Sequence, residues 1–539
     1  MRLRTIAAIS AAGSCALALT GCTADKLGVV GPTARVGDTS PLQVSFASAP
    51  ASLDPAKSCT GEDRQLLNSL YARLVDFGAK RGPEGTTQID YTTIMPYLAK
   101  SWDTSEDGKT YVFKLQTGWK FPSGAPMDAE AVEFSLERTL TMGQCGSSIL
   151  NDLYTDPPLI KDIDAPDHET VVIKLNQPDP QVLAALADTS GGIVDPTLVE
   201  ANGGVKANEG NAWMDSHAAG GGAYVLSSYS AGTSAVLKAN PTYGGLPPES
   251  EEIQITWVTS PSTQLLNVEN GTTDIAFGLS GSALNSLKSK QNVKVVAYDD
   301  TQSMVMTMPN NREPWTNRDL REAVVKAIPA QDIIKNVLYG FGKQYYGPIP
   351  PSMPGYSEEH GQPVPANVEE AKKLVDKSGV KTPINVTLDI LAGDQNQKAL
   401  STVIQSALKQ IGINITVRTL TSSAWNDAVY NGKSQATLRF DGPALANAGY
   451  YLQYDEACSS VGTFNTGYIC VRANTPLLDE ARKTSDEAER DRLYAQLTKN
   501  WVEAYPRVTL YQSLTPFVLS TSVRKFHFSS SYDMRTWAK

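Results

Sequence analysis

Residues 98–126 read LAKSWDTSEDGKTYVFKLQTGWKFPSGAP and predict a β-hairpin that leads into a helix. The pair Asp107-Gly108 suits a tight turn, and apolar and polar side chains alternate directly after it over residues 111–116. Residues 124–126, Gly-Ala-Pro, then interrupt the chain. Asp128 stands where it can cap a helix whose apolar residues recur at every fourth position, namely Val132, Leu136 and Leu140. The stretch therefore combines antiparallel strands and a helix in one unit.

The second half of the chain shows a helix followed by a strand. Residues 395–411 have a helical apolar pattern, and Gly412 stands where it can end that helix. Apolar and polar residues then alternate over 413–417, which predicts a strand. The same alternation near the start of the chain, in PLQVSFASA at residues 41–49, predicts another strand. Helices and strands thus mix along the sequence, which predicts an α/β protein.

The size and charge of the chain limit its possible roles. With 539 residues it is too long for one hydrophobic core, so two or three domains are expected. Its 41% hydrophobic and 19% charged residues are ordinary for a globular protein. Because 47 Lys and Arg stand against 57 Asp and Glu, the net charge is -10 and the molecule repels phosphate backbones. We therefore expect no nucleic-acid partner.

The N-terminus has the features of an export signal. Arg2 and Arg4 precede an uncharged, mainly apolar run over residues 6–19. The run ends in Leu-Thr-Gly-Cys at 19–22, which resembles the lipobox of bacterial lipoproteins. We expect cleavage before Cys22 and acylation of Cys22, which would anchor the protein to the outer face of the cell membrane. An ordinary signal peptide with an incidental cysteine is the alternative.

Four of the 6 cysteines remain for disulfides once Cys15 leaves with the signal and Cys22 carries the lipid. They are expected to be oxidised outside the cell, where four cysteines allow three pairings. We favour Cys458 with Cys470, because turn-forming Gly and Asn residues lie between them, and Cys59 would then pair with Cys145. No metal site is expected, because no Cys-x-x-Cys occurs and the 4 histidines lie far apart in sequence.

The sequence lacks three common catalytic and phosphate-binding motifs. Gly-x-Ser-x-Gly, His-Glu-x-x-His and a Gly-rich phosphate loop are all missing. Adjacent acids such as Asp299-Asp300 are expected to be solvated surface charges, since neighbouring side chains on a strand or helix point apart. We therefore expect no enzymatic activity and no cofactor. The alternative is a secreted hydrolase whose carboxylates converge only in the fold.

Several motifs in a fixed order resemble one protein family. They are SLDP (52–55), LYARLV (70–75), the hairpin stretch 98–126, GGAY (221–224), NGTTDIA (270–276), PWTNRDLREA (314–323) and KQIGI (409–413). Together they resemble the family 5 extracellular solute-binding proteins of bacterial ABC importers, the group that contains the oligopeptide- and dipeptide-binding proteins. The resemblance runs from about Leu42 to the C-terminus.

The resemblance implies an α/β fold of the periplasmic-binding-protein type. It has two lobes, an additional third domain and a ligand cleft between the lobes. The implied segments are a signal peptide (1–21), a lipidated tether (22–41), lobe one (42–57, 207–300 and 508–539), the extra domain (58–206) and lobe two (301–507).

The resemblance also implies ligand contacts. Trp425 follows the strand after Gly412, where peptide-binding members place a tryptophan that faces the ligand; a core tryptophan is the alternative. Arg439 and Asp441 resemble the segment that lines the peptide site, and their charges suit the two ends of a peptide. The family's Asp-Pro run is absent, because GPALANAGYY (442–451) follows Asp441. Ser48 and Ala49 are expected to offer backbone groups at the hinge.

The sequence therefore predicts an exported, lipid-anchored substrate-binding protein of an ABC transporter. It would capture short peptides outside the cell as a monomer and deliver them to the permease. An oligosaccharide, a metal complex or haem is the alternative ligand within the same role. The identity and length of the ligand, the permease and the role of Asp441 stay open.

Overall fold

The computed structural model of the chain describes residues 40–58, 60–152 and 157–539. The expected signal peptide and Cys22, most of the tether, and Cys59 lie outside the described residues. Within the described ranges, no helix is both long and apolar enough to cross a membrane.

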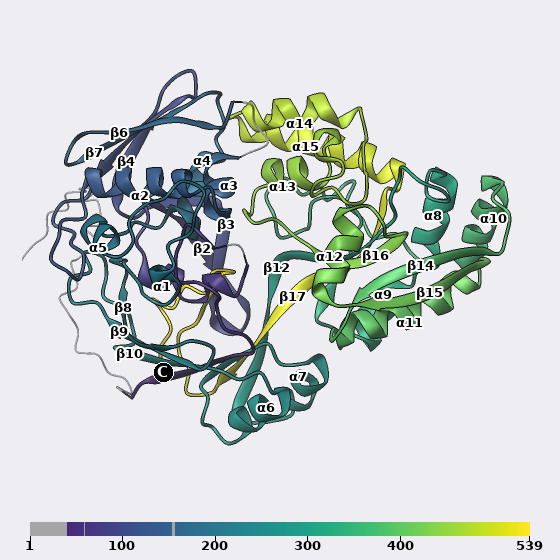
Figure 1. The fold of residues 1–539 in the computed structure, drawn as a ribbon. Coiled ribbons are helices and arrows are strands. Elements are labelled where there is room, and N and C mark those ends of the chain that lie inside the picture. Colours follow the sequence, from purple (N-terminus) through teal and green to yellow (C-terminus); the bar gives the residue numbers. More distant parts are fainter. Residues whose placement is uncertain (1–39, 59, 153–156) are drawn as a thin grey trace, which may run out of the picture. The chain divides into compact units, whose positions relative to one another are not determined.

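An 11-stranded sheet extends through both lobes, in the order β15-β14-β16-β12-β17-β11-β1-β10-β9-β8, with β13 on β17. Its strands are β1 (Leu42–Phe46), β8 (Tyr224–Ser230), β9 (Ser234–Ala239), β10 (Glu252–Trp257), β11 (Ile275–Phe277), β12 (Val293–Thr307), β13 (Gly342–Lys343), β14 (Ile384–Leu391), β15 (Ile413–Leu420), β16 (Ala436–Asp441) and β17 (Arg507–Ser520). The antiparallel strands β12 and β17 are its longest, with 15 and 14 residues. Figure 1 shows these two strands running between lobe one and lobe two.

Lobe one has its own hydrophobic core around β1, which pairs parallel with β10 and β11. Leu42, Val44 and Phe46 are buried in this core, so the first strand expected from the sequence is confirmed. The helices of this lobe are α6 (Pro261–Glu269) and α7 (Gly281–Leu287). The C-terminal segment contributes Phe526 and Trp537 to the same core.

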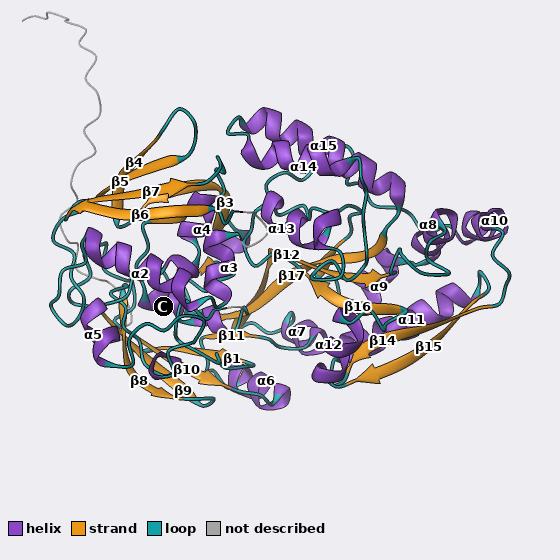
Figure 2. Cartoon of the chain, turned by 45° about the horizontal axis from the view of Figure 1, so that its top comes forward, coloured by secondary structure: helices purple, strands orange, loops and turns teal. Residues whose placement is uncertain are grey.

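The extra domain contains the expected hairpin and helix. β4 (Ala99–Thr104) and β5 (Thr110–Leu115) pair antiparallel, and Gly108 adopts a φ of 67° in the turn between them. β6 (Ile160–Asp167) and β7 (Thr170–Leu175) complete a 4-stranded sheet, which Figure 2 shows apart from the central sheet. The Asp128 carboxylate accepts a hydrogen bond of 3.2 Å from Ala131 N and caps α2 (Ala129–Met142), so the prediction for this stretch is confirmed.

A smaller sheet joins the extra domain to the end of the chain. It consists of β2 (Val75–Arg81), β3 (Thr87–Pro96) and β18 (His527–Phe528). β18 pairs with β3 through His527 and Thr87. Besides α2, the extra domain contains the helices α1 (Leu67–Leu70), α3 (Cys145–Asn151), α4 (Val182–Ala187) and α5 (Pro196–Ala201).

Lobe two confirms the expected succession of a helix and a strand. α11 (Gln395–Lys409) precedes β15, and Gly412 between them has a φ of 80°, a conformation that favours glycine. β14 pairs parallel with both β15 and β16. The other helices of this lobe include α8 (Arg318–Ala327), α9 (Ala330–Asn336), α10 (Val368–Ser378) and α12 (Ser422–Tyr430). Residues of α8, α9, α10 and α11 contribute to the hydrophobic core beside these strands.

Three helices of lobe two form a second, smaller core. They are α13 (Ala448–Asp455), α14 (Asn474–Lys483) and α15 (Glu487–Ala504), and Figure 2 shows α14 and α15 side by side. The boundary that we expected after Asp300 falls inside β12, so it marks a point along a strand that runs through both lobes. The exact domain bounds stay a prediction.

Candidate ligand-binding cleft

A cavity of about 460 Å³ lies where lobe one, the extra domain and lobe two meet. Its volume is within the range of roughly 300–1,000 Å³ that is usual for small-molecule sites. The lining comes from residues 60–62, 64–65, 68, 76–77, 89, 91, 187–188, 277, 300–302, 442–446, 515 and 527–533. Leu445 and Tyr450 of lobe two pack in the core of the extra domain, so these two parts contact each other beside the cavity. We refer to this cavity as the cleft.

A β-bulge directs part of β12 into the cleft. Asp299 pairs with Leu514 and Ser303 with Gln512, so three residues of β12 stand opposite a single residue of β17. These three residues, Asp300, Thr301 and Gln302, all line the cleft. Bulges of this kind re-aim side chains and are common beside functional sites.

The Asp300 carboxylate is held by neutral donors. Thr515 Oγ1 donates to Oδ2 at 2.6 Å, and Thr301 N donates to Oδ1 at 2.7 Å. Burial raises the pKa of Asp300 above its ordinary value, and these hydrogen bonds oppose that shift only in part. The sequence-based expectation that Asp299 and Asp300 are both surface charges is therefore wrong for Asp300, because the bulge turns it into the cleft.

Other acids of the cleft lining are paired with guanidinium groups. Asp188 Oδ2 lies 2.7 Å from Arg64 Nη1. Asp76 Oδ1 lies 3.0 Å from Arg73 Nη2. Arg535 donates to both Asp76 and Asp533, with 2.8 Å between Arg535 Nε and Asp533 Oδ1. Burial alone would raise the pKa of Asp76, but the two arginines lower it below its ordinary value. The guanidinium groups thus already compensate these carboxylates.

Arg439 and Asp441 come together, as a buried ion pair with each other. Arg439 Nη2 lies 2.8 Å from Asp441 Oδ1 and 2.6 Å from Asp455 Oδ1. Asp441 Oδ2 accepts from Tyr451 OH at 2.8 Å and from Arg507. Burial opposes ionisation of Asp441, but the two arginines hold its pKa well below its usual range. Both oxygens of Asp441 are therefore occupied by protein donors, and its expected contact with a ligand stays a prediction.

The remaining expected contacts lie outside the cleft lining. Trp425 in α12 is 8% exposed, and its Nε1 has no hydrogen-bond partner among the described residues. The exposed Ser48 accepts, through its carbonyl, a hydrogen bond of 3.0 Å from Gln65 Nε2, and Gln65 does line the cleft. Ala49 packs against the core of lobe one. Ligand contacts of Trp425, Ser48 and Ala49 stay predictions.

Sequence reasoning missed the residues directly after Asp441. Residues 442–446 line the cleft, and they begin the segment in which the family's Asp-Pro run is absent. That departure from the family pattern was the available signal. Asp300 had no such signal, because a bulge cannot be read from an isolated pair of acids.

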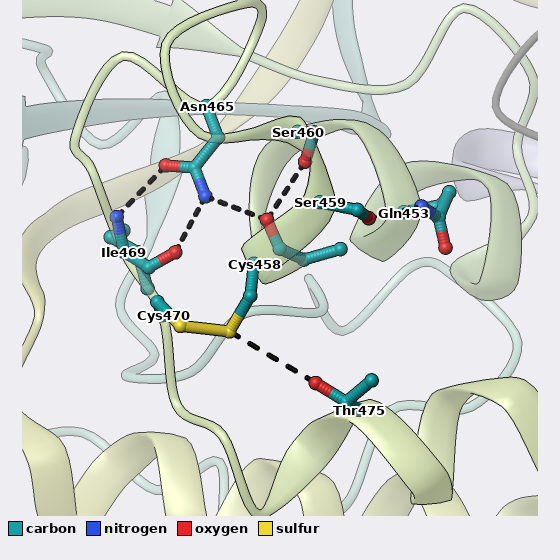
Figure 3. Close-up of a disulfide and its surroundings, with 9 residues drawn as sticks. Gln453, Cys458, Ser459, Ser460, Asn465, Ile469, Cys470 and Thr475 are labelled. Atoms are coloured by element: carbon teal, nitrogen blue, oxygen red, sulfur yellow. Dashed lines mark hydrogen bonds between the residues drawn. A yellow bond between two sulfur atoms is a disulfide. The ribbon is translucent and has the colours of Figure 1, made fainter.

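The structure contains the expected disulfide between Cys458 and Cys470 (Figure 3). The side chain of Asn465 stabilises the enclosed loop, because its Nδ2 donates to Ile469 O at 2.6 Å and its Oδ1 accepts from Ile469 N at 2.9 Å. From this loop, Thr466 Oγ1 accepts from Arg439 Nη1 at 3.0 Å. Cys145 is also disulfide-bonded, and its expected partner Cys59 lies outside the described residues.

Two carboxylates and one imidazole among the described residues lie close enough together to be considered as metal ligands. Candidate ligand atoms of Asp128, Glu130 and His168 lie within 4.8 Å of one another. Asp128 caps α2, and His168 Nδ1 lies 3.0 Å from Glu130 Oε2 at an exposed position. Helix capping and one surface hydrogen bond account for this arrangement, so we assign it no metal.

Comparisons with known proteins show which proteins share this sequence and fold. A family model described as "Bacterial extracellular solute-binding proteins, family 5 Middle" matches residues 93–462. The probable D,D-dipeptide-binding periplasmic protein DdpA of Escherichia coli (strain K12) is 29% identical over 490 residues, 90% of this chain and 91% of that protein. Heme-binding protein A of Haemophilus influenzae is 24% identical over 467 residues, 84% of this chain and 83% of that protein.

The fold is shared with a solved structure of a periplasmic binding protein. DppA from Helicobacter pylori, in complex with the peptide STSA, matches with a TM-score of 0.75. The match covers 93% of this chain and 98% of that chain at 22% identity. The expected α/β fold with two lobes and a third domain is thereby confirmed.

Proposed function

The chain belongs to the bacterial extracellular solute-binding proteins of family 5, and we propose that it captures short peptides and delivers them to the permease of an ABC importer. The observation that carries the proposal is the cleft of about 460 Å³ between the lobes and the extra domain. Gly61, Gly442 and three consecutive serines at 529–531 line it, so main chain lies close to the cavity. Backbone groups can bind an extended peptide whatever its side chains.

The comparisons support a peptide as the ligand. The relative from Escherichia coli is named for D,D-dipeptides, and the matched structure from Helicobacter pylori contains a peptide. Hinge closure of the two lobes would bury such a ligand. The protein would then act by binding and release, as a monomer and without catalysing a reaction.

A lipid anchor at Cys22 is a further part of the proposal. The Arg-containing start, the apolar run and the Leu-Thr-Gly-Cys segment support it, and they are all features of the sequence. Acylation there would keep the receptor at the outer face of the membrane, near its permease.

Haem or a metal complex is the second candidate ligand. The relative from Haemophilus influenzae is named for haem, and His527 in the cleft offers an imidazole. An oligosaccharide is a third ligand class in the same receptor role. These ligands differ in mass and in absorption spectrum, so a direct identification separates them.

The test is to identify what the protein carries. Purified protein is denatured, and the released small molecules are analysed by mass spectrometry and by absorption spectroscopy. Binding of L-dialanine, D-dialanine and L-trialanine is then measured by calorimetry. Recovered peptides and saturable binding are expected. Release of haem, a metal complex or a sugar, without binding of these peptides, would contradict the proposal, and turnover of the peptides would favour a hydrolase.

A further inference from the structure

We propose that Asp300 is the residue that binds the cationic amino group of the ligand, so that the amino terminus of a peptide lies against the bulge of β12. This inference rests on the proposed peptide-binding function. It assigns to Asp300 the contact that the sequence had assigned to Asp441.

The first support is that the carboxylate is rigidly placed in the cleft. The Asp300 carbonyl accepts hydrogen bonds from Gln512 Nε2 at 2.6 Å and from Ser352 Oγ at 2.7 Å. Its side chain accepts from Thr515 Oγ1 and from Thr301 N. Backbone and side chain are thus both fixed. Oδ1 also accepts from Gln302 N at 3.4 Å, whereas Oδ2 accepts only from Thr515 Oγ1 among the described residues and keeps a lone pair for a ligand. A ligand contact there would need little reorganisation.

The second support is the charge of the cleft lining. Its acids are Glu62, Asp76, Asp188, Asp300 and Asp533, and its possible cations are Arg64 and His527. Arg64 compensates Asp188, and arginines outside the lining compensate Asp76 and Asp533. Burial lowers the pKa of His527, so the ring adds no charge near neutral pH. Asp300 forms no ion pair with any Lys, Arg or His of the described residues.

The third support is energetic. A partly dehydrated carboxylate without a counter-ion is unfavourable, and burial correspondingly raises the pKa of Asp300. An arriving ammonium removes that penalty through a charge-assisted hydrogen bond. Binding of an amine at this position therefore relieves an unfavourable feature of the empty cleft.

Asp441 is the less suitable acceptor for the same ammonium. Its two oxygens already accept from Arg439, Arg507 and Tyr451, and the residue is 4% exposed. An ammonium at this carboxylate would lie beside two guanidinium groups and be repelled by them. Lobe two would instead contact the ligand through residues 442–446 at the cleft.

The test compares amines with acetylated ligands in three proteins. Calorimetry measures L-dialanine, D-dialanine and L-trialanine, each with its N-acetyl form, against the wild type, Asp300→Asn and Glu62→Gln. Glu62 is the matched control, because it is an exposed carboxylate of the same lining. Asparagine is nearly isosteric with aspartate and can still accept from Thr301 N. Thermal unfolding without ligand checks that each variant is folded.

Asp300 as the amine acceptor predicts that the wild type binds the free amine at least about thirtyfold more tightly than the acetylated peptide. Asp300→Asn should lose this discrimination, and Glu62→Gln should keep it. Peptide binding with less than threefold discrimination in the wild type, or unchanged discrimination in Asp300→Asn, would overturn the inference and leave the proposed function standing. If the wild type binds none of the peptides in either form, the proposed function fails and the inference fails with it.

Discussion

Arg482 Nη2 lies 3.1 Å from Asp179 Oδ2, and this ion pair joins α14 of lobe two to the extra domain across 303 residues of sequence. The same nitrogen also donates to Asp152 at the end of α3. Gln181 Nε2 bridges the two carboxylates, with 2.9 Å to Asp179 and 3.1 Å to Asp152. These side chains are all buried.

Replacing Arg482 by methionine should destabilise the protein by about 3 kcal/mol, because two buried carboxylates would lose their counter-ion. Urea denaturation measures the free energy of unfolding. The matched control is Arg492→Met on neighbouring α15, whose pair with Glu489 is largely exposed and should contribute much less to stability because solvent screens it. Equal losses for the two variants would show that the Arg482 contact contributes no more than a surface pair.

Glu456 should make stability fall as the pH rises toward neutrality. Its carboxylate accepts from Trp501 Nε1 at 2.6 Å and lies 3.1 Å from Arg507 Nη1, and burial raises its pKa from 4.5 to about 7. Because the folded pKa lies above the unfolded one, its contribution to stability is fully present below about pH 4.5 and is lost as the pH rises through 7.

Glu456→Gln removes the ionisation and can still accept from Trp501. The stability of the wild type relative to Glu456→Gln should therefore fall by up to about 3 kcal/mol between pH 4.5 and pH 8. Urea denaturation of both proteins at several pH values measures this difference. A difference that does not change with pH would contradict the prediction.

The local elements of the fold could be predicted because their signals are local. Asp107-Gly108 and Asp128 fix a turn and a helix start through contacts within a few residues. Gly412 likewise turns the chain between α11 and β15 through its own positive φ. Each of these features depends on backbone conformation that the neighbouring residues determine, so the sequence alone was sufficient.

The candidate site could be predicted only in part, because its charges are assigned by contacts between distant segments. Asp441 looked available for a ligand, but Arg507, 66 residues away, occupies it. Asp300 looked like a surface charge, but a bulge against β17 places it in the cleft. Spacing in the sequence reveals neither relationship. The family pattern indicated the correct region at residues 442–446 without indicating that Asp300 lies in the same cleft lining.

Cys22→Ala should release the protein from membranes. We expect acylation of this cysteine to provide the anchor, and no helix of the described residues could replace it. Fractionation of cells that express either protein, with detection of the acyl chains by mass spectrometry, measures the effect. Cys145→Ala is a suitable control, because it removes a cysteine that is disulfide-bonded and expected to carry no lipid. Membrane retention of Cys22→Ala would contradict the lipoprotein proposal.

Gly442→Ala should weaken ligand binding through Gln302. A Cβ at Gly442 would lie 2.8 Å from Gln302 Cγ and 3.1 Å from Gln302 Cα, so the end of β16 packs directly against the bulge that holds Asp300. Overpacking of this kind typically costs about 1–3 kcal/mol. If the bulge shifts to relieve the clash, it displaces Asp300, the proposed acceptor of the ligand amine. The expected loss of affinity for the alanine peptide that binds the wild type best is roughly five- to hundredfold.

The matched control for this prediction is Gly61→Ala in the same cleft lining. A Cβ at Gly61 meets no atom within 4 Å, and Gly61 is not among the glycines with positive φ, so the added methyl group disturbs no protein packing and the loss of affinity should be smaller than in Gly442→Ala. Calorimetry measures the affinity of both variants, and thermal unfolding shows whether Gly442→Ala remains folded. Unchanged affinity in a folded Gly442→Ala would mean that the contact with Gln302 does not position the binding site. An equal loss in both variants would mean that any added methyl group in the cleft weakens binding by simple obstruction.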